Sequence, residues 1–299
     1  MSRDSIDSFL FNCKGLPDFK KFTPERIKKE FPQLLEKINK DFQDFETLLS
    51  DNSEHEELQW ETVMGPINNL NERLRWSWGV ISHLNSVNNS ESLREVYSDL
   101  LPLVINLGNK FGQSKIIYLA LKELKNNSKL DETEHRILDK QILEMEHSGI
   151  SLAKKEQEEF NLISERLGKL STEFSNNILD ATNEWYLILE EENEIEGIPE
   201  RVKELMALAA KKHLKITGDS NYKNGPWKLG LDIPTYTAFM TYSENRSLRS
   251  KLYKAFVSRA SKGEIDNNPI IEEILYLRLK KAHLLGYQNW AELSLSTKM

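Results

Sequence analysis

The chain has 299 residues, of which 39% are hydrophobic and 29% are charged, and its formal net charge is −7. This balance is typical of a globular protein rich in helix formers and excludes a disordered or fibrous chain. An acidic chain repels phosphate, and no stripe of Lys and Arg interleaved with aromatic residues offsets that repulsion here. We therefore expect no nucleic acid partner.

The start of the chain is charged and lacks an apolar run of the kind found in signal peptides. The longest mainly apolar stretch, 100–107, is far shorter than the roughly 20 residues that cross a bilayer. Cys13 is the only cysteine, which excludes an intramolecular disulfide and a thiolate cluster for a metal. These features predict a cytoplasmic protein with no membrane partner.

Helical periodicity dominates the first two thirds of the chain, where apolar residues recur at three- and four-residue spacings. Thr23-Pro24 is typical of a helix start, and Asp131 is a second predicted N-cap. The pattern predicts six helices, which begin near Pro24, Trp60, Glu91, Phe111, Asp131 and Lys154 and end before the loop at 51–57 and near His83, Gly108, Lys125, His147 and Asn183.

The character of the sequence then changes. Segments 185–189 and 227–231 are rich in β-formers and predict a small sheet beside a helix from about Pro199 to His213. Helices are predicted to resume near Pro234, Asn245 and Pro269, the last ending at Gly286. The expected fold class is therefore mainly α, a multi-helix array with one small β-sheet. Residues 290–299 begin a new amphipathic segment without a final cap, which indicates a chain cut short.

One segment begins like a zinc motif. His55-Glu56-Glu57-Leu58-Gln59 starts as H-E-x-x-H, in which two His residues one helical turn apart bind the same metal and the Glu acts as base. Position 59 is Gln, so one primary ligand is missing. The segment is also polar, which favours surface sequence without a metal.

Two Glu-x-x-His pairs, Glu132 with His135 and Glu144 with His147, are of the kind that di-iron carboxylate proteins use. Those proteins place the pairs on different helices, whereas both pairs here fall within one predicted helix. Their 12-residue separation corresponds to roughly 18 Å along a helix axis. They cannot hold one di-metal centre, and a solvated helix surface is the favoured interpretation.

The remaining polar clusters have similarly plain interpretations. The acidic run from Glu190 to Glu196 lacks the ligand spacing and turn glycine of a calcium loop, so it is predicted to be a solvated loop. His83 and His213 are isolated. Trp76 and Trp78 are two residues apart, so a helix directs them to different faces and predicts core packing. We therefore predict no catalytic, cofactor-binding or metal-binding residue in this chain.

A series of short segments, taken in order, resembles the N-terminal half of the zinc oligopeptidases of the thimet oligopeptidase, neurolysin and oligopeptidase A family, and most closely its bacterial oligopeptidase A branch. The similarity covers nearly the whole chain. The segments are Leu16-Pro17-Asp18-Phe19, Phe22-Thr23-Pro24-Glu25, Ser82–Val87, Leu93-Arg94-Glu95, Ser148-Gly149-Ile150, Ser175–Thr182, Leu231-Asp232-Ile233-Pro234, Met240-Thr241-Tyr242, Tyr253-Lys254-Ala255-Phe256, Leu284-Leu285-Gly286-Tyr287 and Ser294–Met299.

The resemblance implies one part of a mostly helical, two-lobed, channel-forming metallopeptidase that cleaves short peptides. In that family, zinc is held by the two His of H-E-x-x-H and by a Glu on a following helix, all beyond the point where this chain stops. We therefore expect residues 1–150 to form an N-terminal helical domain. Residues 151–299 are expected to begin the peptidase domain and to stop before the zinc-binding helix.

These expectations define the partners and the alternatives. The parent enzyme is expected to use zinc, to bind short peptides and to contain a C-terminal catalytic half, while this chain alone is expected to be inactive and to bind no zinc. One alternative is a non-enzymatic helical module that binds a partner helix or peptide in an apolar groove. Another is a helical oxidase built on the Glu-x-x-His pairs, which their spacing argues against.

Overall fold

The computed structural model describes residues 9–11, 15–52, 58–126, 129–217 and 223–298. The chain divides into two compact units, which are residues 1–169 with 275–299, and residues 170–274. The divisions fall within two helices, α6 (Lys154–Glu184) and α10 (Asn268–Leu284). We call them the first and the second unit and describe each by itself.

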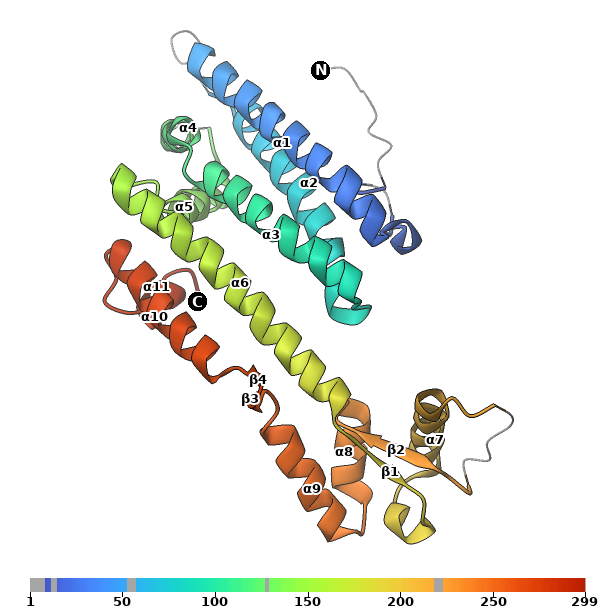
Figure 1. Cartoon of the computed structure of the whole chain (residues 1–299). Helices are drawn as coiled ribbons and strands as arrows, with labels where there is room; N and C mark the ends of the chain where they lie inside the picture. Colours follow the sequence, from blue (N-terminus) through green and yellow to red (C-terminus); the bar gives the residue numbers. More distant parts are fainter. Residues whose placement is uncertain (1–8, 12–14, 53–57, 127–128, 218–222, 299) are drawn as a thin grey trace. The chain divides into compact units, whose positions relative to one another are not determined.

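The first unit is built from helices. Its three long helices, α1 (Pro24–Asn52), α2 (Trp60–Val87) and α3 (Glu91–Gly112), pack against one another and run in alternating directions (Figure 1). Only residues 88–90 join α2 to α3, and so short a connection favours antiparallel neighbours. The remaining elements are the 3₁₀ helix η1 (Phe19–Lys21), α4 (Lys115–Lys125), α5 (Glu132–His147), the parts of α6 and α10 that belong to this unit, and α11 (Trp290–Leu295).

The core of this unit is the apolar stripe that the sequence predicts for α1. Ile27, Phe31, Ile38 and Phe42 are fully buried, and they pack with residues of α2, α3, α4 and α5. Trp76 and Trp78 do diverge, because Trp76 contacts Phe11 and Phe22 whereas Trp78 stacks on Tyr97. No helix in the described ranges is both long and apolar enough to cross a bilayer.

Several predicted helix ends are confirmed. The α1 helix begins at Pro24, and the Arg26 amide donates to Thr23 Oγ1 at 3.4 Å. Asp131 and Glu134 form a capping box at the start of α5. At the end of α10, Gly286 adopts a φ of +82°, and the amides of Gly286 and Tyr287 donate to the carbonyls of His283 and Ala282. This is the left-handed helix end that favours glycine.

Other boundaries differ from the predictions. The α2 helix continues to Val87, and α3 passes through Gly108 and ends at Gly112. The next helix begins at Lys115, four residues later than predicted, because Ser114 Oγ accepts from the Ile117 amide and caps it. The segment at 290–299 forms α11, which ends at Leu295 where the Ser296 amide donates to the Glu292 carbonyl.

The second unit contains the predicted sheet. Strand β1 (Tyr186–Leu189) pairs antiparallel with β2 (Trp227–Gly230), and the register places Leu189 opposite Trp227. The helix α7 (Glu200–Leu214) and the helix α8 (Ile233–Tyr242) both contact β2. Trp227 and Leu229 are fully buried, and they pack with Phe239 of α8. The fold class, mainly α with a small sheet, is thus confirmed.

The rest of the second unit comprises η2 (Glu192–Ile195), α9 (Arg246–Val257) and a β-hairpin that the sequence did not predict. The hairpin consists of β3 (Ser261–Lys262) and β4 (Ile265–Asp266), joined by a two-residue turn. Gly263 opens this turn with a φ of +76°, a conformation that two-residue hairpin turns require and that glycine adopts without strain.

A buried asparagine joins this hairpin to α6. Asn267 is 2% exposed, and its Nδ2 donates to the Phe174 carbonyl at 3.1 Å while its Oδ1 accepts from Asn177 Nδ2 at 2.9 Å. Its backbone amide donates to the Ala260 carbonyl at 2.8 Å. One residue therefore connects α6 to the segment that follows α9.

Replacement of Asn267 by Ala should destabilise the second unit, because it leaves the Asn177 amide and the Phe174 carbonyl without their buried partner. We expect a loss of roughly 1–3 kcal/mol in the free energy of unfolding, measured by urea denaturation. Asn183→Ala is the matched control, because Asn183 is exposed on the same helix and should change stability little. Equal stability of the two variants would show that the Asn267 bonds are not needed.

Candidate functional site

The two Glu-x-x-His pairs lie on one helix, α5, as predicted. Glu132 and His135 are in its first turn, and Glu144 and His147 are in its last. Within the described ranges, no three or more His, Cys, Asp or Glu residues lie close enough together to hold a metal ion. These residues therefore do not fit a zinc ion or a di-metal centre.

His147 makes a contact within the first unit. Its Nε2 lies 2.8 Å from the Tyr287 hydroxyl and 3.4 Å from Ser296 Oγ, and its ring meets the Tyr287 ring edge-on. Burial lowers the pKa of His147, and the charges of Glu146 and Glu144 partly oppose this effect. The imidazole therefore links α5 to the turn after α10.

The acidic run forms a turn. The Glu194 carboxylate accepts from the backbone amides of Glu190 and Glu191 at 2.9 and 3.1 Å. Glu194 lies within η2, and its carboxylate caps the start of this helix. The other Glu side chains of the run are exposed. The segment is a 3₁₀ helix where the sequence predicted a loop.

The isolated histidines are separate from each other. His83 lies beside the Phe19 ring, and His213 packs edge-on against Tyr186 with Lys228 Nζ 3.5 Å from its Nδ1. The residues His55, Glu56 and Glu57 and the only cysteine, Cys13, lie outside the described residues.

Lys281 on α10 is a second group with a perturbed environment. Its Nζ lies 4.3 Å from the centre of the Phe160 ring and donates to Ser164 Oγ at 3.0 Å. Burial lowers the pKa of Lys281 to about 8. Its neighbour Lys280 instead pairs with Glu159 at the surface. Both belong to the first unit.

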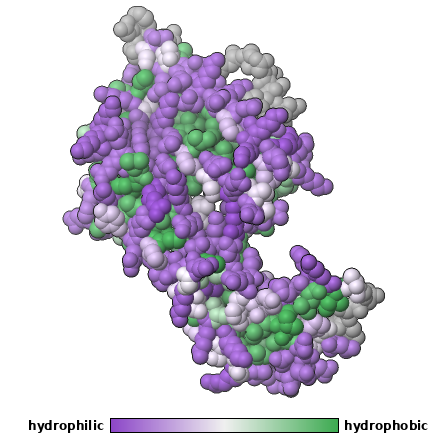
Figure 2. Space-filling view, in the orientation of Figure 1, coloured by the Kyte–Doolittle hydropathy of each residue, from purple (hydrophilic) through white to green (hydrophobic). Residues whose placement is uncertain are grey.

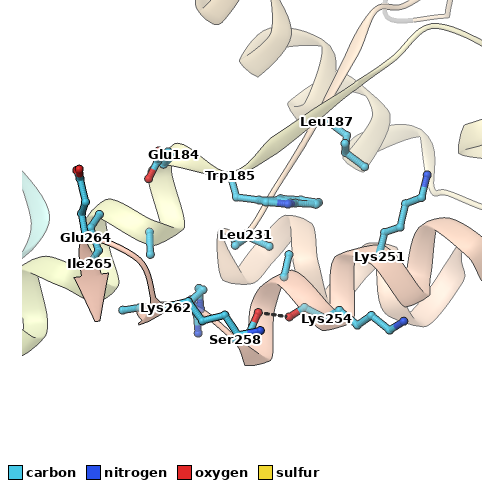
Figure 3. A pocket seen from close by; sticks show the side chains of 14 residues that line it. Glu184, Trp185, Leu187, Leu231, Lys251, Lys254, Ser258, Lys262, Glu264 and Ile265 are labelled. Atoms are coloured by element: carbon cyan, nitrogen blue, oxygen red, sulfur yellow. Dashed lines mark hydrogen bonds between the residues drawn. The ribbon is translucent and has the colours of Figure 1, made fainter. Parts of the chain in front are cut away.

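A concave site that collects several charged side chains lies in the second unit, and we call it the basic pocket. It has a volume of about 910 Å³, which is within the range of ligand pockets. Figure 3 shows its lining side chains. They come from the end of α6, β1, the residue after β2, α9 and the β3–β4 hairpin, and are Ala181, Glu184, Trp185, Leu187, Leu231, Lys251, Lys254, Ala255, Ser258, Arg259, Ala260, Lys262, Glu264 and Ile265.

The floor of the basic pocket is apolar. The Trp185 indole lies over Leu231, with Leu187 beside it (Figure 3). Leu231 is buried and belongs to the core of the second unit, whereas Trp185 and Leu187 are partly exposed. The floor therefore packs on the core of the second unit on one side, and its other side is open to a ligand.

The rim of the basic pocket is charged. Lys251 and Lys254 on α9 recur at helical spacing with Ser258, the residue that follows the helix. Lys262 and Glu264 both come from the hairpin, and Figure 3 shows Glu184 and Glu264 on the side of the rim away from Lys251 and Lys254. The pocket therefore presents four cations, counting Arg259, and two carboxylates, Glu184 and Glu264.

Arg259 is held rigidly. Its Nε donates to the Phe256 carbonyl at 2.9 Å, its Nη1 donates to Thr182 Oγ1 at 3.0 Å, and its guanidinium stacks on the Phe256 ring at 3.7 Å. Burial lowers the pKa of Arg259 from its usual range, although a guanidinium stays charged at neutral pH. The arginine therefore presents a fixed positive charge.

The sequence analysis did not identify these residues. A signal was present, because residues 245–263 contain six basic residues and no acidic one in a chain whose net charge is −7. The apolar floor gave no such signal, because Trp185 and Leu231 are separated by 46 positions and meet only through the pairing of β1 with β2.

Comparison with known proteins gives two family matches. Residues 31–157 match the family described as Neurolysin/Thimet oligopeptidase, N-terminal domain, and residues 239–299 match the family described as Peptidase family M3.

Individual relatives align over almost the whole chain. The Probable cytosolic oligopeptidase A of Arabidopsis thaliana is 37% identical over 100% of this chain and 42% of its own length. The Oligopeptidase A of Haemophilus influenzae is 36% identical over 99% and 42%, and that of Escherichia coli is 35% identical over 95% and 41%. The chain therefore spans about two fifths of the length of these relatives.

Replacement of Lys281 by Met should stabilise the protein at pH 7. Below pH 8 the lysine is charged in both states, so the folded state carries the full cost of burying the ammonium, up to about 3 kcal/mol for a pKa lowered to about 8. Between pH 8 and 10 the folded protein releases this proton before the unfolded chain does. The advantage of Lys281→Met in urea denaturation should therefore shrink as the pH rises.

Lys280→Met is the matched control, because this neighbouring lysine is partly exposed and ion-paired with Glu159. Its effect on stability should not change between pH 7 and 10. A pH-independent effect of Lys281→Met would show that the ammonium is not desolvated in the folded state.

Proposed function

This chain belongs to peptidase family M3, and from that membership we propose that it is the N-terminal, non-catalytic portion of a zinc oligopeptidase that hydrolyses short peptides. The observation that carries the proposal is the alignment of the whole chain with oligopeptidase A relatives of which it spans about two fifths. The catalytic zinc belongs, in this proposal, to an H-E-x-x-H helix in the rest of the enzyme.

The chemistry of the described residues supports the placement of the catalytic zinc in the rest of the enzyme. Zinc that activates water needs three protein ligands and an open fourth position. No such ligand set exists among the described residues, so we place no step of hydrolysis on them. The role left to this part is to shape and limit access to the catalytic centre.

We propose that residues 1–150 form the N-terminal helical domain and one wall of the substrate channel, and that residues 151–299 begin the peptidase domain. The first family match, at 31–157, and the second, at 239–299, support this order. A narrow channel admits a flexible peptide and excludes a folded protein, so its walls set the length of the substrate.

Exposed apolar residues support the proposal that another part of the enzyme packs against this chain. On α10, which lies within the second family match, Leu275 is 59% exposed and Tyr276 is 62% exposed. In the second unit, Leu208 of α7 is 62% exposed, and Figure 2 shows an apolar band on the visible face of that unit. Contiguous apolar surface is typical of an interaction site.

The cytoplasm is the proposed location. One similar protein is named a probable cytosolic oligopeptidase A, and the single cysteine of this chain suits a reducing compartment. Short peptides are the proposed substrates, as the family name of these relatives suggests.

The purified 299-residue chain should not cleave a quenched fluorescent octapeptide above the blank rate, and elemental analysis should find no stoichiometric zinc. The same chain fused to the remainder of the Haemophilus influenzae oligopeptidase A should cleave it, because the fusion supplies the missing ligands. A chelator should abolish this turnover, and added zinc should restore it.

The remainder of the relative without this chain is the control for that experiment. Chelator-sensitive turnover by the 299-residue chain alone would contradict the proposal, and so would one tightly bound zinc per chain.

Deletion of residues 1–150 from the active fusion tests the proposed wall. The truncated fusion should lose its preference for an 8-residue over a 25-residue peptide, measured as the ratio of the two kcat/KM values, because the channel entrance is wider. An active, folded truncation with unchanged length preference would refute the assignment of the wall to these helices.

A further inference from the structure

We propose that the basic pocket of the second unit binds a short peptide by its C-terminal carboxylate and a large apolar last side chain. The peptide as ligand rests on the proposed function, whereas the carboxylate and the apolar side chain follow from the pocket itself. Nothing in the family matches assigns a ligand to this pocket.

The cations are available for an anion. Lys251, Lys254, Lys262 and Arg259 line one pocket, and no carboxylate of the described residues pairs with any of them. Like charges placed together repel one another, and an anion between them relieves that repulsion. This concentration of positive charge occurs in a chain of net charge −7, so it is not a consequence of overall composition.

Arg259 gives the pocket a preorganised donor. Thr182 and Phe256 accept hydrogen bonds from two of its N–H groups and fix the plane of the guanidinium. An arginine has five N–H donors, so three remain for a ligand. A carboxylate is the anion that matches this planar fork.

The apolar floor argues against a bare inorganic anion. Trp185, Leu187 and Leu231 line the floor with mainly apolar surface, which does not suit a hydrated phosphate. They do offer a surface for an aromatic or aliphatic side chain, whose removal from water is favourable. The ligand that uses the whole pocket therefore has an apolar body next to its carboxylate.

The arrangement of the charges favours a peptide over a simple carboxylic acid. Figure 3 shows Glu184 and Glu264 on one side of the pocket and Lys251 and Lys254 on the other. A short peptide carries a carboxylate at one end and donor N–H groups or an ammonium at the other. Its polarity therefore matches the polarity of the pocket, and a volume of about 910 Å³ accommodates several residues.

The test is a titration of the 299-residue chain with the tripeptide Ala-Ala-Phe, followed through the indole N–H resonance of Trp185 and assigned with the Trp185→Phe variant. We expect saturable binding. The C-terminal amide of the same peptide and 3-phenylpropionate, which lacks the peptide backbone, should each bind about tenfold more weakly. The first comparison tests the carboxylate, and the second separates a peptide from an apolar acid.

Substitutions of the pocket lysines test whether these side chains bind the peptide. Lys251→Gln with Lys254→Gln should weaken Ala-Ala-Phe binding about tenfold, whereas Arg246→Gln should not, because Arg246 is an exposed cation on the same helix outside the pocket. Equal binding of the acid and the amide, or equal binding of 3-phenylpropionate, would overturn the proposal.

A further outcome would reassign the pocket. If the active fusion with the relative's remainder hydrolyses peptides normally but the Trp185 resonance no longer responds to Ala-Ala-Phe, the pocket is a packing surface for the rest of the enzyme. That result would overturn the ligand assignment and leave the proposed function intact. Chelator-sensitive hydrolysis by the chain alone would overturn the proposed function and leave the ligand assignment intact.

Discussion

The second unit depends on a buried amide that ties distant segments together. Asn267 donates to the Phe174 carbonyl, accepts from Asn177 and donates through its backbone to Ala260. A buried polar group of this kind stabilises only the arrangement that satisfies it, since every alternative leaves an unpaired donor or acceptor. The hairpin, the end of α9 and α6 therefore have one favoured arrangement, and the basic pocket is a consequence of it.

Arg259 adds a second tie in the same place. It connects Thr182 on α6 with Phe256 on α9 through hydrogen bonds and ring stacking. The arginine thus serves the architecture and, at the same time, contributes a fixed positive charge to the pocket. Because its position is set by packing, its charge does not have to be ordered when a ligand binds, which lowers the entropic cost of recognition.

The two units differ in what they offer to chemistry. The first unit has helices packed around an apolar core, and its polar clusters are used internally, as His147 shows with Tyr287. The second unit has the basic pocket. Among the described residues, neither unit brings three or more His, Cys, Asp or Glu residues close enough together to hold a metal ion. The roles proposed for this chain, control of access and recognition of a peptide, need surface shape and charge and no reactive group.

Local sequence determined the helices, because their signals lie within one or two turns. The N-cap at Asp131, the start at Pro24 and the glycine end at Gly286 were predicted for this reason, as were the fold class and the family resemblance. The predicted end of α3 at Gly108 was wrong. The helix continues through this glycine, because the side-chain cap at Ser114 sets where the next helix begins.

Tertiary structure alone decided the burial of Lys281, the β3–β4 hairpin and the basic pocket. The pocket brings together side chains from the end of α6 to the hairpin, and it is held by a bond between Asn177 and Asn267, 90 positions apart. Such contacts depend on which helix faces pack against each other. The spacing of residues along the chain does not determine that packing.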